Sequence, residues 1–285
     1  MRRLGVVAAA VVVLLSGCGD HGEPDHAEPD RSDAGHPSAD HPSAAASPAA
    51  GAALPGLPAG ARVDYQLGGA YPPAAGVAGV VRDRTDSPAA GLWSACYVNA
   101  FQSQPRSHDW PEDLLLHAGG ARVEDPDWPG EFLVDISTDR QRERAMAVVG
   151  PWLDGCAAAG FTAVEPDNLD SWTRSHDRLD ADDAAAFARL LVARAHADGL
   201  VIGQKNAPEL AGGHLGFDYA VTEDCGRYDE CAVFTAVYGS AVLDVEYSDR
   251  GFTKACRTGG FSVQRRDLDV LPAGRAGYVA EWCAS

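Results

Sequence analysis

The stretch FTAVEPDNLDSW, residues 161–172, joins an apolar run to three closely spaced carboxylates, Glu165, Asp167 and Asp170. The apolar residues at its start are typical of a strand that is covered on both faces. Like charges so close together repel, and burying them costs free energy unless they are paired or used. The stretch therefore predicts a buried strand whose end opens onto a functional site.

The same order of elements recurs along the chain. Residues 140–159 carry apolar side chains at helical spacing and stop before Gly160. Residues 182–198 begin with acids and stop before Gly199, which is the pattern of a helix with both ends marked. Nine short, mostly apolar runs are candidate strands: 63–67, 79–83, 95–100, 132–136, 161–166, 200–206, 217–223, 241–247 and 261–266.

Strands that alternate with helices predict right-handed βαβ units and a parallel sheet. Nine candidates in residues 61–285 predict an α/β fold, a closed (β/α)8 TIM-type barrel with one possible extra strand. The sequence does not indicate which strand is extra. A doubly wound open sheet is the alternative, but no glycine-rich phosphate loop follows the first candidate strand.

Residues 1–17 are typical of a secretory signal, because two arginines precede an apolar run too short to span a bilayer. The ending LSGC, residues 15–18, resembles a bacterial lipobox, in which Cys18 becomes the lipidated first residue. An ordinary cleaved signal with an incidental cysteine is the alternative. We expect an exported chain, held by its lipid on the outer face of the cell membrane or cell surface.

Residues 18–60 are rich in Pro, Ala, Ser, Gly, Asp and His, and they cannot bury enough apolar surface to fold. They predict a disordered tether, and residues 61–285 the barrel. Four histidines lie in the tether, so metal binding there is an alternative, but a solvated linker is favoured. Neither a metal nor a cofactor is expected in the barrel.

The charge of the chain narrows its partners. The formal net charge is −18, and residues 61–285 carry 20 basic and 34 acidic side chains. This balance excludes nucleic acid as a partner and favours a neutral or cationic ligand, although acidity can also serve solubility alone. We expect a monomer whose contact with the membrane is through the lipid only.

Six cysteines remain when Cys18 is set aside, and an even number in an exported chain predicts three disulfides. Fifteen connectivities are possible for six cysteines. The short loop favours Cys225–Cys231, followed by Cys256–Cys283 and Cys96–Cys156. The spacings do not match a zinc pattern.

Polar side chains mark the ends of most candidate strands. In a (β/α)8 barrel, functional groups gather where the strands end. One acid after a strand can be a helix cap, but about six strands ending this way indicate a site. The candidates are Asp64, Tyr65, Gln66, Tyr97, Asn99, Asp135, Glu165, Asp167, Asn168, Asp170, Lys205, Asn206, Glu223, Glu246 and Tyr247.

Two carboxylates from different strands, held in different environments, can have their pKa values pushed apart. That arrangement is the equipment for cleaving a glycosidic bond. Aromatic side chains near them, such as Tyr65, Tyr97 and Tyr247, are candidate platforms for sugar rings.

Six blocks carry a resemblance in their order along the chain: DYQLGGAYPP (64–73), CYVNAFQSQP (96–105), VEPDNLDSW (164–172), IGQKN (202–206), FDYAVTEDCGRYDEC (217–231) and VEY (245–247). Together they resemble the endo-α-1,4-polygalactosaminidases of glycoside hydrolase family 114. The resemblance implies a (β/α)8 barrel that hydrolyses α-1,4-linked galactosamine polymers of microbial exopolysaccharide. It also implies that Asp167 and Glu223 are the catalytic pair.

The residues by themselves leave alternatives open. They do not rank Asp167 above Glu165, and Glu246 is the main rival to Glu223. Glu165 can instead be an ion-pair partner of Lys205. Lys205 and Asn206 are expected to orient a carboxylate or bind a sugar hydroxyl, and Asp170 can be a helix cap. The alternative function is a non-catalytic polysaccharide-binding lipoprotein on the same barrel.

Overall fold

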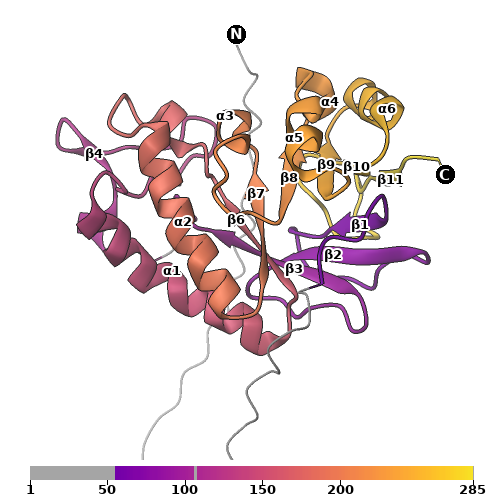
Figure 1. Cartoon of the computed structure of the whole chain (residues 1–285), viewed down its shortest axis with the longest axis horizontal. Helices are drawn as coiled ribbons and strands as arrows, with labels where there is room; N and C mark the ends of the chain where they lie inside the picture. Colours follow the sequence, from indigo (N-terminus) through magenta and orange to yellow (C-terminus); the bar gives the residue numbers. More distant parts are fainter. Residues whose placement is uncertain (1–54, 106–107, 285) are drawn as a thin grey trace, which may run out of the picture. The chain divides into compact units, whose positions relative to one another are not determined.

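The computed structural model describes residues 55–105 and 108–284, so the predicted signal, the lipidation site Cys18 and most of the tether lie outside it. Nine strands form one sheet in the order β1-β2-β3-β6-β7-β8-β9-β10-β11 (Figure 1). They are β1 (Arg62–Tyr65), β2 (Val77–Asp83), β3 (Trp93–Asn99), β6 (Ala163–Asp167), β7 (Val201–Lys205), β8 (Tyr219–Glu223), β9 (Val242–Glu246), β10 (Ser262–Arg266) and β11 (Ala280–Trp282). A separate hairpin pairs β4 (His117–Ala118) with β5 (Ala121–Arg122).

The strands from β1 to β10 are parallel neighbours, as in the predicted (β/α)8 barrel. Eight of the nine candidate strands are confirmed. The candidate 132–136 is wrong, because its residues make only isolated antiparallel bridges, such as Gln102 with Leu133. The extra strand is instead β11, a short segment that pairs antiparallel with β10.

Both predicted helices are confirmed. Thr138 caps α1 (Asp139–Ala159), which ends at Gly160 in a left-handed conformation. Asp180 and Asp183 form a capping box at the start of α2 (Ala181–Ala197). The remaining helices are α3 (Pro208–Ala211), α4 (Cys225–Tyr228), α5 (Cys231–Tyr238) and α6 (Asp249–Thr258), with 3₁₀ turns η1 (Glu112–Leu114) and η2 (Ser171–Arg174). None of the helices in the described ranges is long and apolar enough to cross a membrane.

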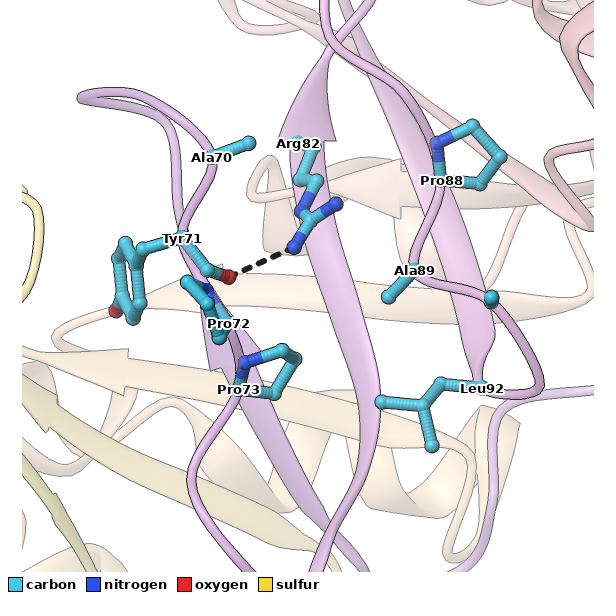
Figure 2. Close-up of a pocket in the computed structure, with 9 residues that line it drawn as sticks. Ala70, Tyr71, Pro72, Pro73, Arg82, Pro88, Ala89 and Leu92 are labelled. Atoms are coloured by element: carbon cyan, nitrogen blue, oxygen red, sulfur yellow. Dashed lines mark hydrogen bonds between the residues drawn. The ribbon is translucent and has the colours of Figure 1, made fainter.

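The first two connections of the barrel contain no helix. Residues 66–76 and 84–92, all of them described, form turns and irregular loops. A hollow of about 390 Å³ lies between these loops on the outside of β2 (Figure 2). Arg82 lines it and ties the loops together, since its guanidinium donates to the carbonyls of Tyr71 at 2.8 Å and Ser87 at 2.7 Å.

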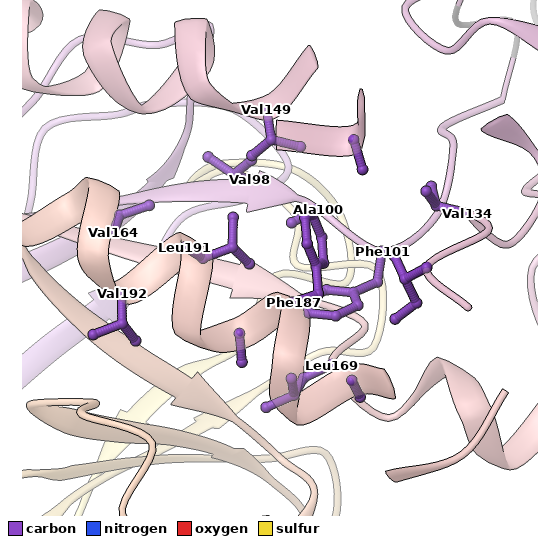
Figure 3. Close-up of a cluster of buried hydrophobic side chains, with 14 of the residues drawn as sticks. Val98, Ala100, Phe101, Val134, Val149, Val164, Leu169, Phe187, Leu191 and Val192 are labelled. Carbon is purple, nitrogen blue, oxygen red and sulfur yellow. The ribbon is translucent and has the colours of Figure 1, made fainter. Parts of the chain in front are cut away.

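Buried apolar side chains form three clusters. One fills the barrel interior and includes Tyr65, Val81, Tyr219 and Val245. A second packs α1 and α2 against the sheet (Figure 3), and a third lies under α4, α5 and α6. Gly203 makes room inside the barrel, because a Cβ there would lie 2.6 Å from the ring of Tyr219. The packed interior leaves the strand ends as the place for a site.

Side chains join β1 to β10, where the described residues show no backbone ladder. The Gln264 amide accepts from the Tyr65 backbone N–H at 2.8 Å and donates to Asp64 Oδ1 at 2.9 Å. Gln66 Nε2 also donates to Asp64, at 2.9 Å, and the Arg266 guanidinium lies 3.7 Å from it. We call Asp64, Gln66, Gln264 and Arg266 the seam. All four are fully buried, and each of their polar side-chain atoms except Arg266 Nε has a partner, so the barrel closes through a buried polar network.

The three predicted disulfides are all present. Cys225–Cys231 closes a loop directly after β8, Cys256–Cys283 ties α6 to the residue after β11, and Cys96–Cys156 ties β3 to α1. The last two bonds cross-link elements 27 and 60 residues apart in the sequence. They therefore constrain the unfolded chain more than the short loop does.

We predict that Gln264→Leu destabilises the fold by about 3 kcal/mol, because it leaves the buried Tyr65 N–H and the buried Asp64 carboxylate short of a partner. Urea unfolding followed by circular dichroism measures the loss. Gln141→Leu, which removes an amide on the surface of α1, is the control and should change stability by less than about 1 kcal/mol. Equal effects of the two substitutions would contradict this role of the seam.

Candidate active site

Lys205 lies at the centre of a cluster of carboxylates at the carboxyl ends of β6, β7 and β8. Its Nζ is 3.1 Å from Glu165 Oε1, 3.0 Å from Asp167 Oδ1 and 3.5 Å from Glu223 Oε2. Asp167, Lys205 and Glu223 are each the last residue of their strand. Neighbouring parallel strands therefore bring their side chains to one point, as predicted for this barrel.

The cluster has a buried floor and an open side. The side chains of Glu165 and Lys205 are 0% and 2% exposed, whereas those of Asp167 and Glu223 are 18% and 32% exposed. The two acids that the sequence did not rank differ in access to solvent: Asp167 reaches solvent and Glu165 does not. Glu165 is an ion-pair partner of Lys205, which was one of the two roles considered for it from the sequence.

Three tyrosines and an asparagine orient these carboxylates. Tyr97 donates to Asp167 Oδ2 at 2.6 Å, Tyr247 donates to Glu223 Oε1 at 2.5 Å, and Tyr65 donates to Glu165 Oε1 at 2.6 Å. Asn206 donates to Glu223 Oε2 at 3.4 Å and accepts from the Glu223 backbone N–H at 2.8 Å. These contacts fix the directions of both exposed carboxylates.

The left-handed backbone of Asn206, with φ of 47°, lets its side chain turn back toward β8. Asn168 has the same conformation one strand away, with φ of 65°. Asparagine tolerates this conformation better than most residues, which accounts for its presence after two neighbouring strands.

The surroundings shift the pKa values of Glu165 and Asp167 in opposite directions. Burial raises the pKa of Glu165 to about 6, although the positive charge of Lys205 opposes the shift. Burial also favours the neutral form of Asp167, but the Lys205 charge and the Tyr97 hydrogen bond outweigh it and hold the pKa of Asp167 below its ordinary value. The pKa of Lys205 is raised well above normal, because the surrounding anions outweigh its burial. Lys205 is therefore a permanent cation, and Asp167 is ionised at neutral pH.

A second polar network adjoins Asp167 on the β3 side. Asn168 donates to Asn99 Oδ1 at 2.9 Å, and Asn99 donates to Glu131 Oε2 at 3.3 Å. Gln102 donates to the same Glu131 oxygen at 2.6 Å, and Arg174 bonds Gln102 and Asn168 at 3.1 and 2.8 Å. Asn99 and Asn168 thus lie beside the cluster, as expected for site residues.

Glu131 and Arg174 were not among the predicted site residues. Glu131 arrives from a loop that precedes the wrongly predicted strand, and nothing in its sequence surroundings marks it. Arg174 carries a weak signal, since it follows Asp170 by four residues in the motif region, and the two side chains are ion-paired at 2.9 Å.

The prediction that Asp64 and Gln66 are site residues is corrected. Both side chains are 0% exposed and belong to the seam, so they hold the barrel closed instead of facing a ligand. The neighbouring Tyr65 points the other way, into the barrel, where its hydroxyl contacts Glu165 and Lys205. The alternation of side chains along a strand explains the split.

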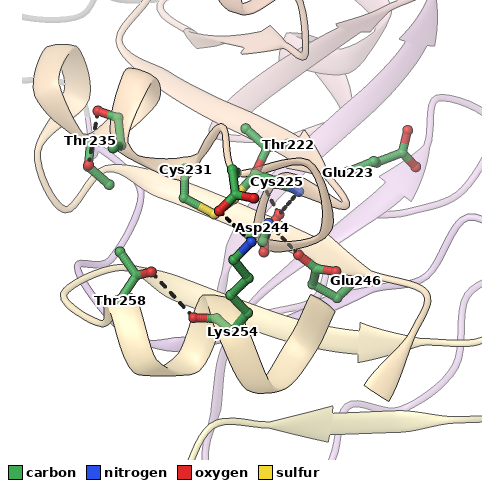
Figure 4. The surroundings of a disulfide bond; sticks show 12 residues. Thr222, Glu223, Cys225, Cys231, Thr235, Asp244, Glu246, Lys254 and Thr258 are labelled. Atoms are coloured by element: carbon green, nitrogen blue, oxygen red, sulfur yellow. Dashed lines mark hydrogen bonds and ion pairs between the residues drawn. A yellow bond between two sulfur atoms is a disulfide. The ribbon is translucent and has the colours of Figure 1, made fainter. Parts of the chain in front are cut away.

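Glu246 is also corrected. It is 0% exposed and lies on the outer side of β9, against α4 and α6 (Figure 4). Its Oε1 accepts from the Gly226 backbone N–H at 2.6 Å, and its Oε2 packs so closely on Gly251 that a Cβ there would clash. Burial raises the pKa of Glu246. Glu223, in contrast, lies beside Lys205, and Glu246 does not.

Asp135 and Asp170 have local partners. Asp135 Oδ1 accepts from the Ser137 backbone N–H and hydroxyl at 3.0 and 2.6 Å, just before α1 begins. Asp170 precedes η2, but its side chain makes no capping bond there and pairs with Arg174 instead. The structure therefore gives both residues a structural partner and brings neither to Lys205.

One group of possible metal ligands occurs in the described part of the chain, formed by Cys225, Cys231 and Asp244 within 4.8 Å of one another. The two sulfur atoms are joined in a disulfide, so neither offers a thiolate to a metal. The carboxylates around Lys205 share its ammonium group as their cation.

Several solved structures have a similar fold. The chain resembles Ega3 of Aspergillus fumigatus, solved in complex with galactosamine, at a TM-score of 0.67 and 21% identity, over 81% of this chain and 97% of that one. It resembles the glycoside hydrolase domain of PelA from Pseudomonas aeruginosa at a TM-score of 0.56 and 13% identity, over 75% and 98% of the two chains. No curated protein sequence matches the chain.

The similarity in fold agrees with the parallel barrel, and a family match adds what fold alone does not carry. The model of glycoside-hydrolase family GH114 matches residues 42–285, which include every strand and helix described above. With its barrel and its carboxylates gathered at the strand ends, this chain belongs to glycoside-hydrolase family GH114.

Proposed function

We propose that this glycoside hydrolase cleaves α-1,4-linked, galactosamine-containing exopolysaccharide with Asp167 and Glu223 as its catalytic pair. The observation that carries the proposal is the pair of partly exposed carboxylates on β6 and β8 that flank one buried ammonium group. The galactosamine bound by the similar Ega3 structure supports an amino sugar as the substrate unit. The chemistry requires two carboxyl groups and no cofactor.

The distances favour a retaining mechanism. Asp167 Oδ1 and Glu223 Oε2 are 3.0 and 3.5 Å from the same nitrogen, so these oxygens are separated by at most the sum, 6.5 Å. Retaining enzymes hold their carboxyl groups about 5–5.5 Å apart, whereas inverting enzymes need about 6.5–9.5 Å to admit a water molecule. This upper limit admits the retaining spacing and excludes all but the lower edge of the inverting range for these two oxygens.

Asp167 suits the role of nucleophile, because Lys205 and Tyr97 stabilise its ionised form. It attacks the anomeric carbon while Glu223 protonates the departing glycosidic oxygen, which breaks the C–O bond. Glu223 then takes a proton from a water molecule, whose oxygen attacks the anomeric carbon and breaks its bond to Asp167. The released sugar keeps its original α-configuration. Lys205 acts through the carboxylates as a positioning residue.

The charge and the disulfides support the setting of this activity. The folded part of the chain carries 34 acidic and 20 basic side chains, so its field attracts a polymer of protonated galactosamine. Three disulfides fit an exported protein, because they persist in oxidising compartments. Anchoring through Cys18 and a monomeric state stay predictions.

The proposed pair is tested by release of reducing ends from partly deacetylated α-1,4-galactosaminogalactan, with the full chain produced in an oxidising compartment. Asp167→Asn and Glu223→Gln should each lower kcat roughly 10²–10⁴-fold, since each removes a group that reacts with the substrate. Asp135→Asn, a carboxylate bonded only near α1, is the matched control and should keep full activity. Proton NMR of the first product should show the α-anomer.

Turnover that survives in both variants would refute the proposed pair. Binding of the polymer without turnover by the unsubstituted chain, unchanged in both variants, would favour the non-catalytic polysaccharide-binding protein instead.

We predict that KM for the deacetylated polymer rises with salt, because salt screens the attraction between an acidic barrel and a polycation. KM for a fully N-acetylated polymer of the same length, which carries no charge, should stay constant. Initial rates over a series of sodium chloride concentrations measure both. A KM for the charged polymer that does not change with salt would show that charge attraction does not contribute to substrate binding.

Glu165 should make stability depend on pH. Its pKa of about 6 exceeds the ordinary value of 4.5, so the folded chain holds this proton more tightly than the unfolded chain does. The resulting stability is present below the ordinary pKa and is lost as pH rises through about 6, a change of about 2 kcal/mol.

Glu165→Gln cannot titrate and should lack this loss. Urea unfolding of both proteins at a series of pH values from about 4 to 8 measures the difference in their stability. A difference that stays constant over this range would mean that Glu165 does not titrate there.

A further inference from the structure

The loop of residues 124–131 is fastened to the site at both ends. Near its start, Asp125 Oδ2 lies 2.6 Å from Arg174 Nε, and Asp125 is 3% exposed. At its end, Glu131 Oε2 accepts from Gln102 at 2.6 Å and from Asn99 at 3.3 Å. The Asp125 backbone N–H donates to the Glu131 carbonyl at 2.9 Å, so the loop closes on itself. It is therefore held in one position beside the strand ends.

Glu131 lies close to Asp167, on the side away from Glu223. Asn99 bridges Glu131 to Asn168, the residue after Asp167, and Asn99 and Asp167 are paired residues of neighbouring strands. Burial raises the pKa of Glu131, and the negative charge of Asp167 raises it further, which agrees with this proximity. Since β3 and β8 lie on opposite sides of β6, a sugar chain crossing the pair from Glu223 past Asp167 meets Glu131 next.

Among the described residues, the Glu131 carboxylate is hydrogen-bonded by neutral side chains. Its hydrogen bonds come from the amides of Gln102 and Asn99, and within the described ranges no lysine, arginine or histidine nitrogen is paired with it. The nearby Arg174 is engaged by Asp125 and Asp170. A half-buried carboxylate that no described cation neutralises, beside the Lys205 cluster, is a suitable partner for a cation that arrives with the ligand.

An aromatic side chain projects from the same loop. Trp128 is 56% exposed, and its backbone is bonded to both anchoring residues, through Asp125 O at 3.3 Å and Glu131 N at 3.1 Å. An exposed indole offers an apolar face to a pyranose ring and attracts a cation held over it.

From these contacts we infer that Glu131 and Trp128 form a subsite for a protonated amino sugar on the β3 side of Asp167. The Glu131 carboxylate pairs with the ammonium group at C2, and the Trp128 ring packs against the sugar. N-acetylation removes the positive charge, so this subsite selects an unacetylated residue. The inference rests on the proposed function and assigns the preference for the charged unit to Glu131.

The test compares two α-1,4-linked galactosamine oligosaccharides of equal length, one fully deacetylated and one fully N-acetylated. Glu131→Gln keeps acceptors for Gln102 and Asn99 but removes the charge. It should lower kcat/KM for the deacetylated oligosaccharide roughly tenfold or more and leave the value for the N-acetylated one within about twofold. Trp128→Ala should raise KM for both oligosaccharides.

Glu124→Gln is the matched control, because Glu124 lies in the same loop and accepts only from the Gly130 backbone N–H, at 2.6 Å. A loosened loop would lower kcat/KM for both oligosaccharides in both glutamine variants. Equal losses on the two oligosaccharides in Glu131→Gln, or no loss on either, would overturn the subsite. An unchanged KM in Trp128→Ala would remove Trp128 from it.

Calorimetric titration separates this inference from the proposed function. The same oligosaccharides are titrated into the Glu223→Gln chain with and without Glu131→Gln. Weaker binding of the deacetylated oligosaccharide alone, in the double variant, would support the subsite even if the unsubstituted chain hydrolysed neither oligosaccharide. Equal binding of the deacetylated oligosaccharide by both variants would refute it.

Discussion

The ammonium group of Lys205, enclosed at the end of β7, is the interaction on which the site depends. It lies within 3.5 Å of carboxylates from both neighbouring strands, Glu165 and Asp167 on one side and Glu223 on the other. Without this cation, three negative charges so close together would favour protonation of at least one of them. Removing one partner of a buried ion pair is strongly destabilising, so the barrel and the site share the same constraint.

The two sides of the barrel are built differently. Helices cover the strands from β3 to β10, whereas the side of β1 and β2 has loops and the buried polar seam. There, Gln264 accepts from the Tyr65 backbone N–H and the Trp282 indole donates to the Val63 carbonyl, so side chains bond backbone groups of β1. The disulfides lie on the helical side, where Cys96–Cys156 joins β3 to α1 and Cys225–Cys231 begins two residues after Glu223. The strand that carries Glu223 is thus fixed close to its carboxyl end.

Much of the site was predictable, because the carboxyl ends of all parallel strands lie at the same end of the barrel. Tyr65, Tyr97, Lys205, Asn206 and Tyr247 were expected and contact the carboxylates. Asp64 and Glu246 share the same sequence features and yet point outward, because alternate residues of a strand face opposite sides. Glu131 was missed, since its loop comes from outside the strand pattern and reaches the site only through the hydrogen bonds of Gln102 and Asn99.

The sequence by itself determined the parallel barrel, both long helices and the order of the polar strand ends, because these depend on local patterns of burial and capping. The motif blocks also indicated the family. Only the tertiary structure decided which acid reaches solvent, which strand is extra and how the barrel closes. Those outcomes depend on which face of a strand lines the barrel interior and on distances between residues far apart in the chain. No local pattern encodes such distances. Glu246 therefore has the sequence features of a catalytic acid, although its side chain is buried beneath α4 and α6.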